Sequence, residues 1–325
     1  MADQVTPESI SGNGPGRSRG LVDRVLSGQH GLRIGWSVLL FLGLYAVLSG
    51  VADMAIAAVL PAETGPISLR TALLQEGSGL VAVLLASAVL ARVEGKRIAA
   101  YGFGGSRIGL RALWGLLWGI VCISGLVGLM WRAGLLTYGG QGLHGRAAWL
   151  YGIGWAAACG LTGLYEESLL RGYLQSRLAR AFGFWPAAVV LSAAFGLWHL
   201  TNDAESALGL LVAAAGGFIF CISLWYTGSL WWAIGFHAGW DWAQGFLFGL
   251  PDSGIVLRGT RLTMHASGNP AWSGGATGPE GSLLMLPVLI LLALGMCAWW
   301  DLPARLRGRM QPPVTGSEGN RSSLR

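Results

Sequence analysis

Charged residues are scarce in this sequence. They make up 12% of its 325 residues, whereas soluble proteins carry roughly 25%. So few charges cannot cover a surface that faces water everywhere, which excludes an ordinary soluble domain. Hydrophobic residues reach 53%, so lipid must cover the remaining surface. The composition therefore predicts an integral membrane protein.

Cysteine and lysine are also rare. The four cysteines all fall inside apolar stretches, and no Cys-x-x-Cys pair is present. This pattern argues against a disulfide framework or a zinc knuckle. Lys96 is the only lysine, and the other basic residues are arginines spread between the apolar stretches. Because they form no continuous basic face, the net charge of +6 indicates membrane topology and no nucleic-acid partner.

Apolar stretches recur along the chain, and each is long enough, or nearly so, to cross a bilayer, which needs about 20 helical residues. We expect an all-α fold, a polytopic transmembrane helical bundle of about eight spans. The spans run over residues 36–60, 71–91, 112–131, 147–170, 186–200, 206–226, 230–250 and 282–300. Residues 171–184 are expected to extend the fourth span along the membrane surface. Pro186 suits the first turn of the fifth span.

The stretches divide the chain into regions. The predicted regions are a disordered cytoplasmic tail (1–34), three N-terminal transmembrane helices (35–146), four helices that carry the candidate site (147–250), an outer loop (251–281), a last transmembrane helix (282–302) and a second disordered tail (303–325). The outer loop is rich in Gly, Pro and Ser, and both tails are mostly polar. No internal repeat is evident.

The positions of the basic residues predict the orientation. Most lie in the tails, between the second and third stretches, or just after the fourth. The exceptions are Arg70, Arg132, Arg146, Arg258 and Arg261. Because basic segments stay on the cytoplasmic side, we expect both termini to be cytoplasmic. The preference for Arg over Lys indicates a bacterial protein, which would place it in the inner (plasma) membrane.

Ionisable side chains within a spanning helix are costly, so each is a candidate for function. Glu167 and Arg171 are four residues apart and can pair on one helix face. Glu166 points about 100° away from Glu167, so it need not share that pair. A buried and unpaired Glu166 is suited to act as a general base on water. Alternatively, both acids merely meet inner-side arginines at a helix end.

Two histidines follow on separate spans. Phe195 and His199 are four residues apart, as are His237 and Asp241, so Asp241 can orient the imidazole of His237. A lone His in a span is more often a packing residue. Polar groups on three helices, however, either converge or face lipid unpaired, at several kcal/mol each. We therefore expect Glu166 and both histidines to share a pocket.

The remaining polar residues carry simpler expectations. Asp53 and Glu76 lie near the outer ends of the first two spans, where they could snorkel or pair with loop groups. Asn202 and Asp203 follow the fifth span, and capping or loop roles suffice for them. No catalytic role is expected for any of these four residues.

Taken in order, the motifs resemble the CAAX-protease and bacteriocin-processing family of intramembrane endopeptidases (CPBP), including lysostaphin-resistance-protein-A-like members. The Glu-Glu-x-x-x-Arg motif matches Glu166, Glu167 and Arg171. Phe-x-x-x-His matches Phe195 and His199, and His-x-x-x-Asn/Asp matches His237 and Asp241. The resemblance covers about residues 147–248. Asp241 stands where the eukaryotic CAAX enzymes carry Asn.

The resemblance implies peptide-bond hydrolysis in a membrane-bound or lipid-modified peptide substrate. Glu166 would activate water, and His199 would assist it or hold the water. His237 and Asp241 would bind the oxyanion or complete the polar cavity. Glu167, Arg171 and Phe195 would support them. If Asp241 stays ionised it cannot donate a hydrogen bond, so His237 or a protonated Asp241 would have to donate.

A zinc ion is an alternative to metal-free catalysis. Glu166, His199 and His237 could supply three ligands, but no His-Glu-x-x-His is present to demand the metal. We favour glutamate-activated water without a cofactor. A second alternative is a non-enzymatic immunity or scaffold protein of the same fold. A transporter is disfavoured, because no inverted repeat is evident.

Overall fold

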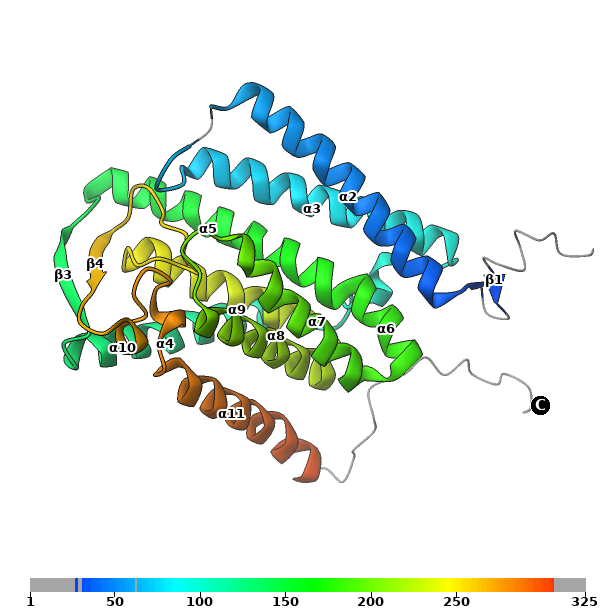
Figure 1. Cartoon of the computed structure of the whole chain (residues 1–325). Coiled ribbons are helices and arrows are strands. Elements are labelled where there is room, and N and C mark those ends of the chain that lie inside the picture. The colour runs from blue at the N-terminus through cyan, green and yellow to red at the C-terminus, as the bar shows by residue number, and fades with distance from the viewer. Residues whose placement is uncertain (1–26, 29–30, 62, 307–325) are drawn as a thin grey trace, which may run out of the picture.

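The computed structural model describes residues 27–28, 31–61 and 63–306, and helices dominate it (Figure 1). The long helices are α2 (Ile34–Val59), α3 (Leu69–Val93), α4 (Ile108–Arg132), α5 (Gly145–Glu167), α7 (Phe184–Trp198), α8 (Ala207–Thr227) and α11 (Met285–Leu306). The shorter ones are η1 (Ile98–Tyr101), η2 (Ser168–Leu174), α6 (Gln175–Phe182), η3 (His199–Thr201), α9 (Trp231–Asp241), η4 (Trp242–Leu247), α10 (Pro270–Ser273) and η5 (Pro279–Gly281).

Six helices of the described chain are long and apolar enough to cross a membrane, so the predicted polytopic bundle is confirmed. The longest is the continuous stretch Gly145–Phe182 of 38 residues, formed by α5, η2 and α6. The last two predicted spans correspond to α9 with η4 and to α11. The apolar part of α11, Met285–Asp301, is shorter than the other six. The expected total of eight spans stays a prediction.

The outer helices expose apolar side chains and the central ones bury them. On α2 the exposed fractions are 60% for Leu39, 62% for Val51 and 72% for Met54, as expected for a helix that faces lipid. On α9, Trp232, Phe236 and Trp240 are all buried, and their rings stack in sequence along one face. Helix α9 is therefore shielded from lipid by its neighbours.

Glycines bring α9 into backbone contact with α4. A Cβ on Gly115 or Gly119 of α4 would lie 2.1 or 2.2 Å from a carbonyl oxygen of α9. A Cβ on Gly235 or Gly239 of α9 would lie 2.0 or 2.3 Å from a carbonyl oxygen of α4. Each helix thus carries a Gly-x-x-x-Gly pair that faces the other, and small residues permit this close approach. The contact fixes the helix that carries His237.

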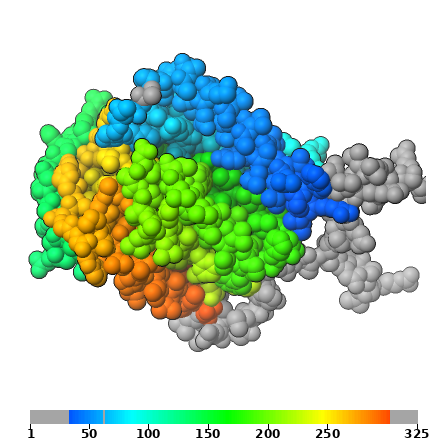
Figure 2. Space-filling model, in the orientation of Figure 1, coloured from blue at the N-terminus to red at the C-terminus, as the bar shows by residue number. Residues whose placement is uncertain are grey.

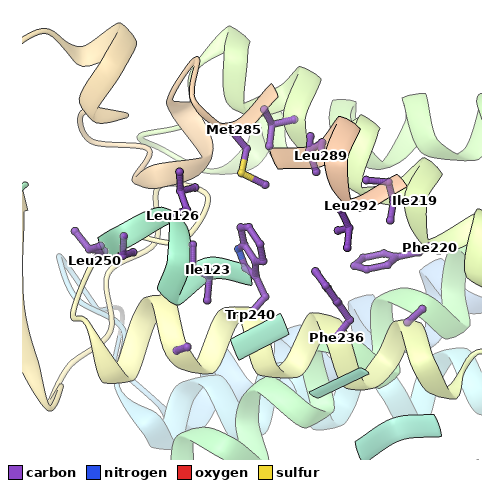
Figure 3. Packing of buried hydrophobic residues seen from close by; sticks show 14 of the residues in the cluster. Ile123, Leu126, Ile219, Phe220, Phe236, Trp240, Leu250, Met285, Leu289 and Leu292 are labelled. Carbon is purple, nitrogen blue, oxygen red and sulfur yellow. The ribbon is translucent and has the colours of Figure 1, made fainter. Parts of the chain in front are cut away.

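One hydrophobic cluster fills the space between α4, α8, α9 and α11. Figure 3 shows Phe236 and Trp240 of α9 pointing towards Leu289 and Leu292 of α11. Ile123 of α4 belongs to the same cluster and is fully buried. The last described helix therefore packs beside α9, although it lies far from α9 in sequence.

Two small antiparallel sheets accompany the helices, namely β1 (Ser27–Gly28) with β2 (Gly31–Leu32) and β3 (Leu136–Gln141) with β4 (Leu262–Ala266). The β3–β4 pairing was not expected from the sequence. It attaches the predicted outer loop to the connection that follows α4. Figure 2 shows this segment, in yellow and orange, covering one end of the bundle.

The predicted regions stay predictions. The structure places α5, η2, α6, α7, α8, α9 and η4 within residues 147–250, apart from the first residues of α5. Most of the two tails, expected at 1–34 and 303–325, lies outside the described residues. Helix α2 begins and α11 ends towards the same end of the molecule (Figure 1).

Candidate functional site

The Glu-Glu motif lies at the junction between an α-helix and a π-helix. Helix α5 finishes at Glu167, and η2 continues as a π-helix with a kink at Gly172. Helix α9 similarly finishes at Asp241, and a second π-helix, η4, follows at once. A π-helical turn shifts the register of the side chains and is frequent at functional sites. Both acidic motifs therefore lie at such a shift.

Glu167 and Arg171 form a buried ion pair, as the sequence predicted. Arg171 Nη1 donates to Glu167 Oε1 at 3.1 Å, and both side chains are 0% exposed. The guanidinium lies 4.6 Å above the ring of Phe195, a favourable cation–π distance. A Cβ on Gly217 of α8 would lie 2.1 Å from Arg171 Nη2. The missing side chain of Gly217 thus makes room for Arg171.

His237 lies among three carboxylates. Its Nε2 atom is 3.5 Å from Glu166 Oε2 and 3.7 Å from Asp241 Oδ2, and its Nδ1 atom is 3.4 Å from Glu167 Oε1. Nδ1 nevertheless has no hydrogen-bond partner, because proximity alone does not give the required alignment. The imidazole also stacks on Phe220, with centroids 5.4 Å apart. The predicted approach of Asp241 and Glu166 to His237 is present.

His199 has a fixed orientation. Its Nδ1 atom lies 2.8 Å from the carbonyl oxygen of Phe195. A carbonyl can only accept, so Nδ1 carries the proton and donates it. A neutral His199 therefore has an unprotonated Nε2 with a free lone pair. That atom can accept a hydrogen bond from water.

One cavity joins these residues. Its volume is about 310 Å³, and Glu166, His199, His237 and Asp241 all line it. Phe195 also lines it, whereas Glu167 and Arg171 lie behind its wall. Much of the remaining lining is apolar, including Val212, Ile219, Met285, Leu289 and Leu292. The cavity thus combines a polar end and an apolar side, and α11 contributes to the latter (Figure 3).

Glu76 departs from its sequence-based expectation. It was expected to snorkel or to pair with loop groups, but its side chain lines the cavity together with Glu166. Its Oε2 atom is buried and has no hydrogen-bond partner. Only the position of an acid within a span could have signalled this residue, since no motif includes it.

The end of the cavity beside the loop 251–281 holds acids that sequence reasoning missed. Glu280 and Asp252 line it, together with Ser253 and Asn202. Asn202 Nδ2 donates to the carbonyl oxygen of Ser253 at 2.9 Å. Burial, together with the charges of Asp241 and Glu280, raises the pKa of the Asp252 carboxyl well above its usual range. No motif or periodicity marks these acids, because they reach the site only when their loop folds back onto it.

The zinc alternative does not fit the geometry. Within the described residues, no group of three or more His, Cys, Asp or Glu side chains is arranged to hold a metal ion. We therefore derive no step through a metal.

The family described as type II CAAX prenyl endopeptidase Rce1-like matches residues 148–243. The matched segment includes Glu166, His199, His237 and Asp241, and it excludes Glu76, Glu280 and α11. A search of curated proteins gives no match.

Proposed function

We propose, from the match of residues 148–243 to the Rce1-like type II CAAX prenyl endopeptidase family, that this chain is an intramembrane endopeptidase. Its substrate is a membrane-associated or lipid-modified peptide, and its reaction is hydrolysis of a peptide bond by glutamate-activated water. The observation that carries the proposal is the single cavity lined by Glu166, His199, His237 and Asp241.

The first step is activation of water. Glu166 removes a proton from a water molecule that the free Nε2 of His199 orients. The hydroxide adds to the carbonyl carbon of the substrate, and the carbonyl oxygen becomes an oxyanion. The C–N bond then breaks, and Glu166 returns the proton to the leaving nitrogen. Atoms and charges balance, because one water is consumed and Glu166 is regenerated.

The second task is stabilisation of the oxyanion. A protonated His237 donates from Nε2, the atom that faces the cavity carboxylates Glu166 and Asp241. Asp241 can then remain ionised and orient the imidazole. A preorganised donor of this kind contributes about 3 kcal/mol to the transition state. Such an arrangement explains why Asp can replace Asn at position 241.

The buried pair behind the cavity wall holds the motif in place. Arg171 is fixed by Glu167 and by the ring of Phe195. Glu167 also approaches His237 Nδ1. We propose that these residues position the catalytic groups and do not contact the substrate.

The test uses purified protein in liposomes with a panel of membrane-anchored and prenylated peptides. Glu166→Gln is expected to lower kcat about 1,000-fold, because the general base is lost. The matched control is Glu63→Gln, which alters a fully exposed acid before α3 and is expected to retain full activity. Equal turnover by wild type and Glu166→Gln would contradict the proposal and favour the immunity or scaffold alternative.

Location within the cell is a further part of the proposal. The helices make the chain an integral membrane protein. We propose a bacterial inner membrane with both termini in the cytoplasm, on the basis of the arginine distribution. Fusion of a reporter to either terminus would test the orientation.

A further inference from the structure

A carboxylate-binding cradle lies at the end of the cavity beside the loop 251–281, and the chain fills it with its own Glu280. Glu280 Oε2 accepts hydrogen bonds from the backbone N of Ser253 at 2.9 Å and from Ser253 Oγ at 2.6 Å. Glu280 Oε1 accepts one from Trp240 Nε1 at 2.9 Å. Three donors thus converge on one carboxylate beside the proposed catalytic residues.

The cradle is held in a costly conformation. Ser253 has φ +44°, and it is one of only two non-glycine residues with positive φ in the described chain. A serine with a left-handed backbone conformation is strained, and such strain is tolerated mainly at functional sites. Gln244 Nε2 donates to the Pro251 carbonyl, and Asn202 to the Ser253 carbonyl, which fixes the loop around it. The loop is therefore built to present the Ser253 donors to Glu280.

In the described cavity lining, no arginine or lysine is available for a second carboxylate, and His237, the cation of the proposed mechanism, already faces the carboxylates of Glu166, Glu167 and Asp241. Among the described residues that line the cavity, none is Arg or Lys, and five are acids: Glu76, Glu166, Asp241, Asp252 and Glu280. The closest guanidinium in the site, that of Arg171, is paired with Glu167 and covered by the Phe195 ring. A substrate carboxylate would therefore lose its water, meet like charges and find its donors occupied.

We infer that Glu280 is a specificity-determining residue, which excludes substrates with a free α-carboxylate close to the cleaved bond and selects internal bonds of longer membrane-anchored peptides. This inference rests on the proposed protease function and deepens it. A CAAX motif stands at the very C-terminus of a protein and ends in such a carboxylate. The substrate class of this chain accordingly differs from the one that the family description names.

The experiment compares two peptides with the same membrane anchor and sequence. Both end three residues after the cleaved bond, one in a carboxylate and the other in a carboxamide. Wild type is expected to cleave the carboxamide with at least a tenfold higher kcat/KM. Glu280→Ala frees the three donors and is expected to bring this ratio to about one or to reverse it. Glu280→Gln keeps the size of the side chain and is expected to reduce the ratio.

Controls separate this inference from the proposed function. Asp203→Asn changes an exposed acid outside the cavity and is expected to preserve the ratio. Equal cleavage of both peptides by wild type, or an unchanged ratio in both Glu280 variants, overturns the inference and leaves the protease standing. If wild type cleaves neither these peptides nor the liposome panel, the proposed function fails and takes the inference with it.

A binding measurement covers the case in which the variants misfold. The tripeptide product is added to wild type as an inhibitor, either as the free acid or as the amide. The amide is expected to inhibit at least tenfold more strongly. Stronger inhibition by the acid would overturn the inference without any variant.

Discussion

Two groups of buried charges differ in how completely they are satisfied. In the first, the Glu94 cluster, Glu94 accepts hydrogen bonds from Tyr173 at 2.5 Å, Arg177 at 3.0 Å and Tyr101 at 3.1 Å. Lys96 adds an ion pair at 3.5 Å. These residues tie together the end of α3, η1, η2 and α6, so the cluster serves as a structural joint.

The second group, the cavity cluster, comprises Glu166, Glu167, Arg171, His237 and Asp241. The distances from the ring nitrogens of His237 to the carboxylate oxygens of the cluster are 3.4–3.7 Å. Glu167 Oε2, Arg171 Nε and Arg171 Nη2 have no hydrogen-bond partner, and neither does His237 Nδ1. Buried polar groups are normally satisfied, so orphaned ones call for an explanation. Of these atoms, only His237 Nδ1 belongs to a residue that lines the cavity, and the other three belong to the buried pair behind its wall.

Breaking the Glu94 cluster should have the largest effect on stability. Glu94→Gln removes the charge that Arg177 and Lys96 face, and loss of one partner in a buried pair costs about 3 kcal/mol. We expect the unfolding free energy in detergent to fall by about this amount, while kcat per folded molecule stays at the wild-type value. A large fall in kcat with unchanged stability would contradict the structural role.

A substitution in the cavity should instead lower kcat and leave the stability unchanged. His199→Asn keeps a donor near the Phe195 carbonyl but removes Nε2. We expect kcat to fall about 100-fold, because water loses its acceptor, while the unfolding temperature stays close to wild type. A packing role for His199 predicts full activity in this variant, so the measured kcat decides between the two roles.

An intermediate effect is expected where Gly217 of α8 packs against Arg171. Gly217→Ala places a Cβ 2.1 Å from Arg171 Nη2. Displacement of this buried side chain should cost about 2 kcal/mol of stability and lower kcat about tenfold. Gly160→Ala on α5 is the matched control, because nothing lies within 4 Å of its Cβ. Similar behaviour of the two variants would show that the fit of Arg171 is unimportant.

The smallest effect concerns pH. Because the pKa of Asp252 is raised in the folded state, the folded chain holds this proton more tightly than the unfolded chain. Its contribution to stability is therefore present at low pH and is lost as the pH rises above the ordinary aspartate value of 3.8. Asp252→Asn should flatten the fall of unfolding temperature with rising pH. An unchanged slope would contradict this prediction.

Much of the bundle could be predicted because hydropathy reports directly on lipid contact. The six helices that qualify as spans lie where apolar stretches predicted them. The proximity of Glu166 and Asp241 to His237 followed from motif spacing and from the cost of unpaired polar groups in lipid. Both inferences succeeded because they depend on residues that are close together in the sequence.

The other features depend on contacts between distant segments. Glu76 was assigned to the membrane edge because its helix alone does not reveal the cavity beside it. Glu280 lies 40 residues from Trp240 along the chain, and no periodicity links them. The β3–β4 pairing likewise joins two segments with no strong strand pattern. Sequence spacing therefore located the motif residues and missed the loop that closes over them.

The glycine contacts between α4 and α9 have a consequence for how this protein can be divided. The motifs all lie after residue 147, which suggests that this segment could fold without the helices before it. Helix α9, however, rests against carbonyl groups of α4 with no side chain between them. A fragment without α4 would expose the backbone face of α9 that α4 covers. The helix that carries His237 would then lose its packing partner. The smallest fragment that folds on its own should therefore include α4, which no motif identifies.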